Sequence, residues 1–173
     1  MLHAVILAAG YGSRLRPLTD GRPKAAVPVA GQALVLHTLD ALARWGVREV
    51  VLVVGYERRV LEALLAGRSD VRVRVVENAA YRTTNTLASL LCAAPLLESD
   101  FLLLDGDLLF EPDLLGPLMR PATLLAIDRG RPLDDDAVKV AVADGRITAV
   151  GKRLAAGHRA VGESIGLARV EAA

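Results

Sequence analysis

An apolar run that ends in a glycine-punctuated, cationic loop constrains this 173-residue chain more than any other feature. Residues 5–8 (Val-Ile-Leu-Ala) are all apolar, which predicts a strand buried on both faces, as in a parallel sheet. Gly10 and Gly12 follow, and glycine permits positive φ and a close approach of the backbone to a ligand. Successive backbone N–H groups in such a turn bind anions, and Arg14 and Lys24 add full positive charges. The segment therefore predicts phosphoryl chemistry.

The spacing of this loop identifies its type. It is neither the GxxxxGK[ST] of a P-loop nor the GxGxxG of a dinucleotide-binding fold. It resembles the signature LAAGxGxRLxPLTxxxPK of the nucleotidyltransferases that make sugar nucleotides and CDP-alcohols, matching it at Leu7-Ala8-Ala9-Gly10, Gly12, Arg14-Leu15, Pro17-Leu18-Thr19 and Pro23-Lys24. The resemblance implies two catalytic residues, Arg14 for the β- and γ-phosphates and Lys24 for the phosphates in the transition state. It also implies a nucleotide-binding set of Leu7, Ala8, Ala9, Gly10, Gly12 and Ser13.

Two acids follow a second buried strand, in the sequence Asp105-Gly106-Asp107. Mg²⁺ prefers oxygen ligands and commonly joins one or two carboxylates to substrate phosphates. By resemblance to the family, the second acid of such a DxD holds the metal, so Asp107 is the expected Mg²⁺ ligand. Asp105 is expected to contact the nucleotide. An isolated DGD is also a common turn, and the assignment depends on its combination with the glycine loop.

The segment from Tyr81 to Leu90 narrows the choice within the family. Its pattern Tyr-x-x-Thr-Asn-x-x-x-Ser-Leu resembles cytidylyltransferases acting on phosphocholine, 2-aminoethylphosphonate or inositol phosphate. Thr84 and Asn85 offer donors and acceptors for a pyrimidine edge, and Ser89 is expected to support Asn85 on the same helix face or to contact the nucleotide. A helix N-cap without ligand contact is the alternative for Thr84 and Asn85.

The C-terminal part is similar to the same subgroup in Val138-Lys139-Val140, Gly151-Lys152 and residues 162–166. This similarity implies that Lys139 and Lys152 meet the phosphate or phosphonate of the acceptor, and that Glu163 binds its cationic head or its hydroxyls. Each could equally be an ordinary strand or hairpin residue. The relatives usually continue through further helices to a late Asp that supplies a second metal ligand. Residues 1–173 are therefore expected to form a single nucleotidyltransferase domain that lacks a C-terminal portion. Three explanations stay open: the chain is a fragment, a partner subunit completes it, or Asp107 and the phosphates alone hold the metal.

Alternating strand and helix patterns predict a three-layer αβα sandwich around a doubly wound, mostly parallel sheet, and by resemblance a Rossmann-like, GT-A-like nucleotidyltransferase fold. The carboxyl ends of the strands, where the glycine loop and Asp107 fall, are the expected binding edge. Expected helices are 34–45, 57–65, 84–93 and 112–119; expected strands are 5–8, 49–54, 71–76, 101–104, 123–127, 137–142, 147–150 and one opening at 162, with a hairpin turn at Asp144-Gly145.

Composition excludes several classes of function. The net charge of +1 gives no bulk field for nucleic acid, and 3% aromatic residues are too few for stacking platforms. No apolar run approaches the ~20 residues of a membrane span, so no membrane insertion is expected. With no secretory signal and a single cysteine, Cys92, a cytoplasmic location is expected.

These observations favour a Mg²⁺-dependent nucleotidyltransferase, with no covalent enzyme intermediate, that couples an NTP, preferably CTP, to a small phosphate or phosphonate acceptor with release of pyrophosphate. A homo-oligomer is compatible with the sequence. Two alternatives stay open: a sugar-1-phosphate nucleotidyltransferase using UTP, dTTP or GTP, and a non-catalytic nucleotide-sensing subunit of the same fold. The presence of both Lys24 and Asp107 argues against a sensor, which needs neither.

Overall fold

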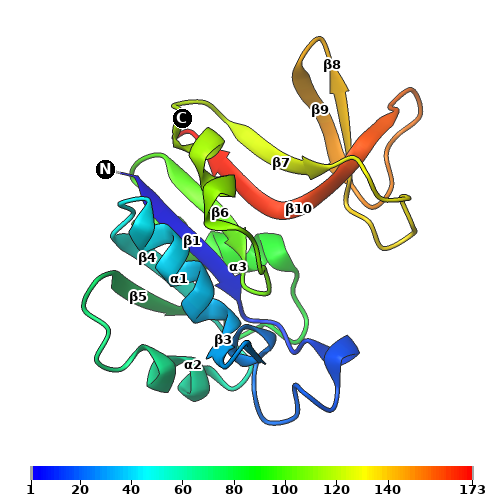
Figure 1. Ribbon diagram of the computed structural model, residues 1–173. Helices are drawn as coiled ribbons and strands as arrows, with labels where there is room; N and C mark the ends of the chain where they lie inside the picture. The colour runs from blue at the N-terminus through cyan, green and yellow to red at the C-terminus, as the bar shows by residue number, and fades with distance from the viewer. Residues whose placement is uncertain (1, 173) are drawn as a thin grey trace.

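A mixed β-sheet with helices on both faces organises the computed structural model, which describes residues 2–172. Within these residues the main sheet has eight strands in the order β5-β4-β1-β6-β10-β8-β9, with β7 paired to β10 (Figure 1). The strands are β1 (His3–Ala8), β4 (Glu49–Val54), β5 (Arg72–Glu77), β6 (Phe101–Asp105), β7 (Leu124–Asp128), β8 (Lys139–Ala143), β9 (Arg146–Gly151) and β10 (Ala160–Val170); β2 (Pro28–Val29) and β3 (Gln32–Ala33) form a small separate pair. The α-helices are α1 (Leu34–Arg44), α2 (Arg58–Leu65) and α3 (Thr86–Ala93), and the 3₁₀ helices are η1 (Ser13–Leu15), η2 (Lys24–Ala26), η3 (Ala94–Leu96) and η4 (Pro112–Met119).

The parallel half of the sheet confirms the predicted fold class. β1 lies between β4 and β6, parallel to both, and β5 extends the parallel set beyond β4. Alternate side chains of β1 enter two separate apolar clusters. Ala4 and Ile6 pack in the cluster that contains residues of α1 and α2, whereas Val5 lies in the cluster bordered by residues of α3. A strand covered on both faces must be apolar throughout, and this is the physical origin of the Val-Ile-Leu-Ala run.

The other half of the sheet is antiparallel, a direction that the strand patterns did not specify. β10 runs antiparallel to β6, β7 and β8, and its register shifts between Ser164 and Ala168 and between Ala160 and Gly162. Figure 1 shows β10 as a long, curved strand that connects the parallel core to the β8–β9 hairpin. The hairpin turn at Asp144-Gly145 is confirmed: both residues have positive φ, 49° and 74°, as a type I′ turn requires.

A buried arginine fixes the end of β10 to the rest of the domain. Arg169 is 6% exposed and donates to the carbonyl oxygens of Leu118 (3.2 Å) and Met119 (2.8 Å) and to Asp100 (2.8 Å). The Arg169 guanidinium, together with the backbone N–H of Ala172, holds the pKa of Asp100 below its ordinary value. This contact joins β10 to η4 and to the residue before β6.

Several predicted boundaries were wrong by a few residues. The third α-helix begins at Thr86 rather than Thr84, because Asn85 has extended backbone angles (φ −108°, ψ −176°) and caps the helix. The helix predicted over 112–119 has these bounds in the structure and is a 3₁₀ helix containing Pro117. β8 begins at Lys139 rather than at Ala137, whose backbone N–H is bound by Asp134 Oδ1. Among the helices described, none has the length and hydropathy needed to cross a bilayer.

Candidate active site

A cavity of about 690 Å³ opens where β1 and β6 end. Ala8 and Asp105 are the last residues of these parallel strands, so the loops that follow both begin at the same edge of the sheet. This is the edge at which ligands bind in open α/β sheets. The lining residues are Leu7, Ala8, Ala9, Gly10, Gly12, Ser13, Arg14, Leu15, Lys24, Ala25, Tyr81, Thr84, Asn85, Thr86, Ser89, Asp105, Gly106 and Asp107. The residues predicted to act on the nucleotide and the predicted metal ligand therefore all border one cavity.

Gly12 allows the glycine loop to close against η2. Its φ is +63°, and a Cβ at this position would lie 2.8 Å from the Cβ of Lys24. The hydroxyl of Thr19 donates to the Gly12 carbonyl oxygen at 3.0 Å and closes the loop from the other side. A side chain on Gly12 would push the loop away from Lys24, which explains why the signature has glycine here.

Lys24 forms an ion pair with Asp107 across 83 residues of sequence. Lys24 begins η2 directly after Pro23, and Asp107 lies two residues beyond β6. Their side chains are 35% and 36% exposed, so solvent and ligands reach both. The contact puts an ammonium and a carboxylate of the two predicted motifs side by side within the same cavity.

Asp105 is a partly buried acid at the end of β6. Burial raises the pKa of Asp105 to about 6, the negative charge of Asp107 adds to the rise, and Lys24 opposes it. Gly166 of β10 accounts for part of this burial: its φ is +77°, and a Cβ there would overlap the Asp105 carboxylate. β10 thus packs closely against the Asp105 carboxylate.

The donor set of this edge fits a divalent cation held jointly with a nucleotide. Among residues 2–172 there is no group of three or more His, Cys, Asp or Glu side chains arranged to hold a metal ion. The negative charge of Asp107 nevertheless helps to raise the pKa of the neighbouring Asp105, and a cation would relieve this repulsion. Mg²⁺ commonly uses one or two carboxylates and takes its other ligands from phosphates and water.

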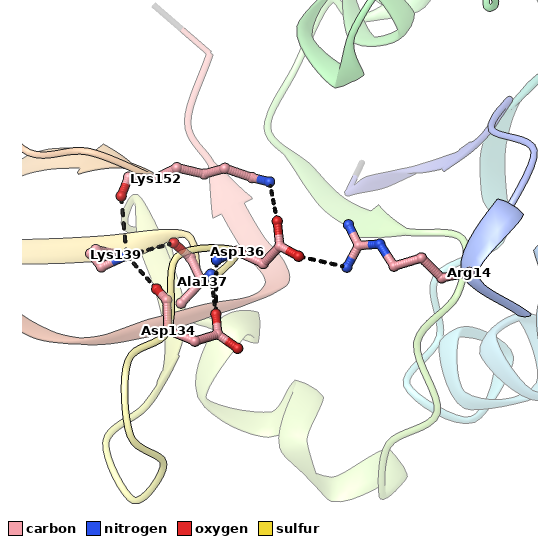
Figure 2. A network of polar contacts seen from close by, with 6 residues as sticks. All are labelled: Arg14, Asp134, Asp136, Ala137, Lys139 and Lys152. Carbon is pink, nitrogen blue, oxygen red and sulfur yellow. Dashed lines mark hydrogen bonds and ion pairs between the residues drawn. The ribbon is translucent and has the colours of Figure 1, made fainter.

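Arg14 faces the antiparallel half of the sheet. Its guanidinium lies 3.3 Å from Asp136 Oδ2, and Lys152 Nζ lies 2.8 Å from the other oxygen of the same carboxylate. Figure 2 shows Asp136 between the two cations. Lys152 first, and then Arg14, hold the pKa of Asp136 below its ordinary value. The exposed Asp136 carboxylate therefore pairs with both Lys152 and Arg14, and Arg14 lines the cavity.

The three predicted acceptor residues lie outside the cavity lining as far as the described chain goes. Lys139 donates to the carbonyl oxygens of Asp134 (2.6 Å) and Lys152 (3.1 Å). Glu163 of β10 lies opposite Lys139 of β8 on one side and Asp128 of β7 on the other. The structure groups these residues beside the rim, where Asp136 links Lys152 to Arg14, rather than around the glycine loop.

Thr84, Asn85 and Ser89 line the same cavity as the glycine loop and the DGD segment. The Asn85 side chain caps α3 by accepting from the Ala88 N–H at 3.1 Å, as its alternative interpretation required. No hydrogen bond joins the side chains of Ser89 and Asn85 among the described residues, and contact of Ser89 with the nucleotide stays a prediction. Ser89 is bound instead by Asn78, a buried residue that the sequence analysis missed. Only its position directly after the β5 strand pattern could have drawn attention to it.

The three tyrosines of the chain form a cluster that the sequence did not predict, and one of them, Tyr81, lines the cavity. The ring centroid of Tyr11 lies 4.4 Å from that of Tyr56 and 5.4 Å from that of Tyr81. The Arg82 guanidinium lies 5.7 Å from the Tyr11 and Tyr81 rings. The cluster fixes the glycine loop to the segments that follow β4 and β5, because each ring comes from a different one of these segments.

The chain is similar in sequence to known proteins. The family model described as "MobA-like NTP transferase domain" matches residues 4–168. The chain is 43% identical over 150 residues to the CMP-5'-(3-aminopropyl)phosphonate synthase of Streptomyces rubellomurinus, covering 85% of this chain and 24% of that protein. It therefore spans about a quarter of the length of that relative.

Two solved structures resemble the fold along nearly the whole chain. The inositol-1-phosphate CTP transferase from T. maritima superposes with a TM-score of 0.82 at 32% identity, covering 98% of this chain and 70% of that one. The CTP:phosphocholine cytidylyltransferase from Streptococcus pneumoniae superposes with a TM-score of 0.70 at 25% identity, covering 99% of this chain and 71% of that one.

Proposed function

The chain belongs to the MobA-like NTP transferase domain family, and from this premise we propose that it transfers a nucleotidyl group from an NTP, preferably CTP, to a small phosphorylated or phosphonylated acceptor. In this reaction an ionised oxygen of the acceptor attacks the α-phosphorus of CTP. The bond from the α-phosphorus to the bridging oxygen of the β-phosphate breaks, and pyrophosphate leaves with that electron pair. The product is the acceptor joined to CMP, and no covalent enzyme intermediate forms.

The contact of Lys24 with Asp107 carries this proposal, because it joins the glycine loop and the DGD segment into one charged site. The backbone N–H groups of the loop and the Arg14 guanidinium bind the phosphates, with Arg14 directed at the β- and γ-phosphates. The Lys24 ammonium stabilises the charge that develops at the α-phosphate. The rest of the catalysis is the in-line positioning of acceptor and nucleotide.

Asp107 would hold a Mg²⁺ ion together with the phosphates, and Asp105 would support it from the nucleotide side. Such an ion supplies charge neutralisation at the triphosphate. In its absence Lys24 neutralises Asp107, so the ammonium is available to the substrate phosphates once the carboxylate binds a cation. Removal of the metal with EDTA is expected to abolish turnover, and Mg²⁺ in excess is expected to restore it.

The preference for CTP and for a small acceptor rests on the relatives and on the two ends of the site. The three relatives named above are a CMP-phosphonate synthase and two CTP-using transferases. Lys152, which lies beside Arg14 across Asp136, is suited to an acceptor phosphate or phosphonate, with Lys139 and Glu163 behind it. A single cysteine suits a reducing compartment, so the proposal places the reaction in the cytoplasm.

Pyrophosphate release tests the proposal. The chain is incubated with Mg²⁺, each of CTP, UTP, dTTP and GTP, and each of phosphocholine, 2-aminoethylphosphonate, inositol phosphate and glucose 1-phosphate. Release with CTP and one of the first three acceptors supports the proposal. Release only with another NTP and glucose 1-phosphate would establish a sugar-1-phosphate nucleotidyltransferase, and no release with any pair would favour a nucleotide-sensing subunit.

A Lys24→Ala variant tests the assignment of the site. Loss of one charge-stabilising donor at the reacting centre is expected to lower kcat by about 100- to 1000-fold. Arg74→Ala, on the exposed edge strand β5, is the matched control for removal of a surface cation and should retain full turnover. Full pyrophosphate release by Lys24→Ala would show that this lysine is not catalytic.

A further inference from the structure

Asn78 is the most completely bonded buried polar side chain near the cavity, and the proposed reaction gives it no role. It follows β5 directly and is 4% exposed. Its Nδ2 donates to Thr84 Oγ1 and to Ser89 Oγ, each at 3.0 Å, and its Oδ1 accepts from the Ala80 N–H at 3.1 Å. A buried amide with its two donors and its oxygen all engaged holds its partners in one arrangement.

The Ala80 N–H fixes which way this amide points. A backbone N–H can only donate, so the atom facing it must be the amide oxygen, and the two amide hydrogens must face the hydroxyls. Both hydroxyls therefore accept a hydrogen bond from Asn78. The polarity of the hydroxyls follows from the backbone of the β5–α3 segment and does not depend on the ligand.

The two hydroxyls consequently present different groups to the cavity that they line. The Thr84 hydroxyl donates its hydrogen to the Ala80 carbonyl oxygen at 2.9 Å, so it can offer a ligand only a lone pair. The Ser89 hydroxyl, 6% exposed, accepts from Asn78 and makes no hydrogen bond as a donor to the described residues. The pair therefore offers the cavity one acceptor, Thr84, and one donor, Ser89.

We propose that Asn78 is a positioning residue for base selection, which orients the Thr84 and Ser89 hydroxyls to match a cytosine ring; this rests on the proposed use of CTP. Cytosine presents a donor at N4 and an acceptor at the adjacent N3. Thr84 accepts from the N4 amino group, and Ser89 donates to N3. Uracil in the same pose presents an acceptor at O4 and a donor at N3, so both contacts become unfavourable, and unmatched buried polar groups are costly.

Replacing Asn78 by Asp reverses the polarity at nearly constant shape. A carboxylate can still accept from the Ala80 N–H, but it can only accept from Ser89, so the Ser89 hydrogen turns away from the base. The affinities of the whole chain for CTP and for UTP are measured by calorimetry without acceptor. The wild type is expected to bind CTP more tightly, and Asn78→Asp is expected to reduce the CTP-over-UTP preference by about tenfold or more, through weaker CTP binding.

Ser89→Ala supplies a readout that a purely structural role would not change. If Asn78 acts through Ser89, Asn78→Asp should lower the CTP-over-UTP preference less in the Ser89→Ala variant than in the wild type. The two effects are then not additive. Thr83→Val is the matched control: the Thr83 hydroxyl donates to the same Ala80 carbonyl oxygen at 3.2 Å but does not line the described cavity. It should leave the preference unchanged. If Asn78→Asp does not fold, Ser89→Ala and Thr84→Val carry the test, and each should lower the preference.

The outcomes separate this inference from the proposed function. A wild type that prefers CTP and a folded Asn78→Asp variant that keeps the full preference overturn the role of Asn78 alone. Effects that add fully with Ser89→Ala also overturn it. A wild type with no preference for CTP over UTP overturns both the role of Asn78 and the assignment of CTP.

Discussion

Substitution of Gly106 by alanine isolates how closely the DGD segment must approach the first strand. The φ of Gly106 lies outside the positive range, so alanine is allowed by the backbone and the effect is steric. A Cβ there would lie 2.8 Å from both the Leu7 carbonyl oxygen and the Ala8 Cβ, and 2.9 Å from the Ala8 Cα. Because these contacts include main-chain atoms of a buried strand, rotation of a side chain cannot relieve them.

The required displacement can be worked out from these distances. Ordinary contact begins near 3.4 Å, so the segment must move by roughly 0.6 Å. Overpacking of this kind costs about 1–3 kcal/mol, and each kcal/mol lowers the Tm of a domain of this size by about 2–4 °C. The shift also breaks or lengthens the hydrogen bond from the Gly106 N–H to the Leu7 carbonyl oxygen (2.9 Å), and it displaces Asp107 from Lys24.

Activity should fall more than stability. A misplacement of about 1 Å at a reacting centre can cost 100-fold, so we expect pyrophosphate release to fall by about 10- to 100-fold at a temperature where the variant remains folded. Thermal unfolding and pyrophosphate release are measured on the same preparation. Gly130→Ala is the control, because a Cβ at Gly130 would meet only the Asp128 side chain at 3.5 Å. Wild-type turnover by a folded Gly106→Ala variant would refute the view that this close approach sets the catalytic geometry.

Three further outcomes are expected. Asn85→Asp keeps the helix cap but removes the amide donor, so it should match the wild type in Tm while weakening CTP binding. Asn85→Ala should weaken CTP binding and also cost about 1 kcal/mol of stability. Equal CTP affinity in the wild type and both variants would assign Asn85 to capping alone. Asp136→Asn frees Arg14 from an exposed ion pair, so triphosphate affinity should rise by no more than about fivefold, and less at high salt; weaker binding would mean that Asp136 positions Arg14. Arg169→Met leaves buried carbonyl oxygens without donors, which should cost about 1–3 kcal/mol in a urea titration at pH 7. The pKa of Asp100 is held low in the folded state, so its contribution to stability is present above its unfolded pKa of about 4 and is lost as pH falls through the folded value. The stability of Arg169→Met should therefore depend less on pH below about 4, and an unchanged acid dependence would contradict the pairing.

The sequence by itself determined the parallel core and the meeting of the glycine loop with the DGD segment. Both are written in short stretches of chain: a strand covered on two faces must be apolar at every residue, and a loop that approaches a phosphate closely needs glycine and nearby cations. Residues 5–8 and 101–104 therefore show where the first and sixth strands end. Because parallel strands share an edge, the motifs that follow them, Lys24 among them, were predicted to meet.

Only the tertiary structure decided how β10 joins the antiparallel half of the sheet and the contacts that depend on this strand. β10 meets β6, β7 and β8 at sequence separations that leave no periodic signal, so neither its direction nor the approach of Gly166 to Asp105 was predictable. The orientation of Asn78 and the pairing of Arg14 with Asp136 have the same origin. A local sequence pattern shows which face of a residue is buried, whereas the packing of distant segments decides which partner it meets there. For this reason the sequence identified the glycine loop and the DGD segment, and only the fold revealed the contacts of Asn78 and Arg14.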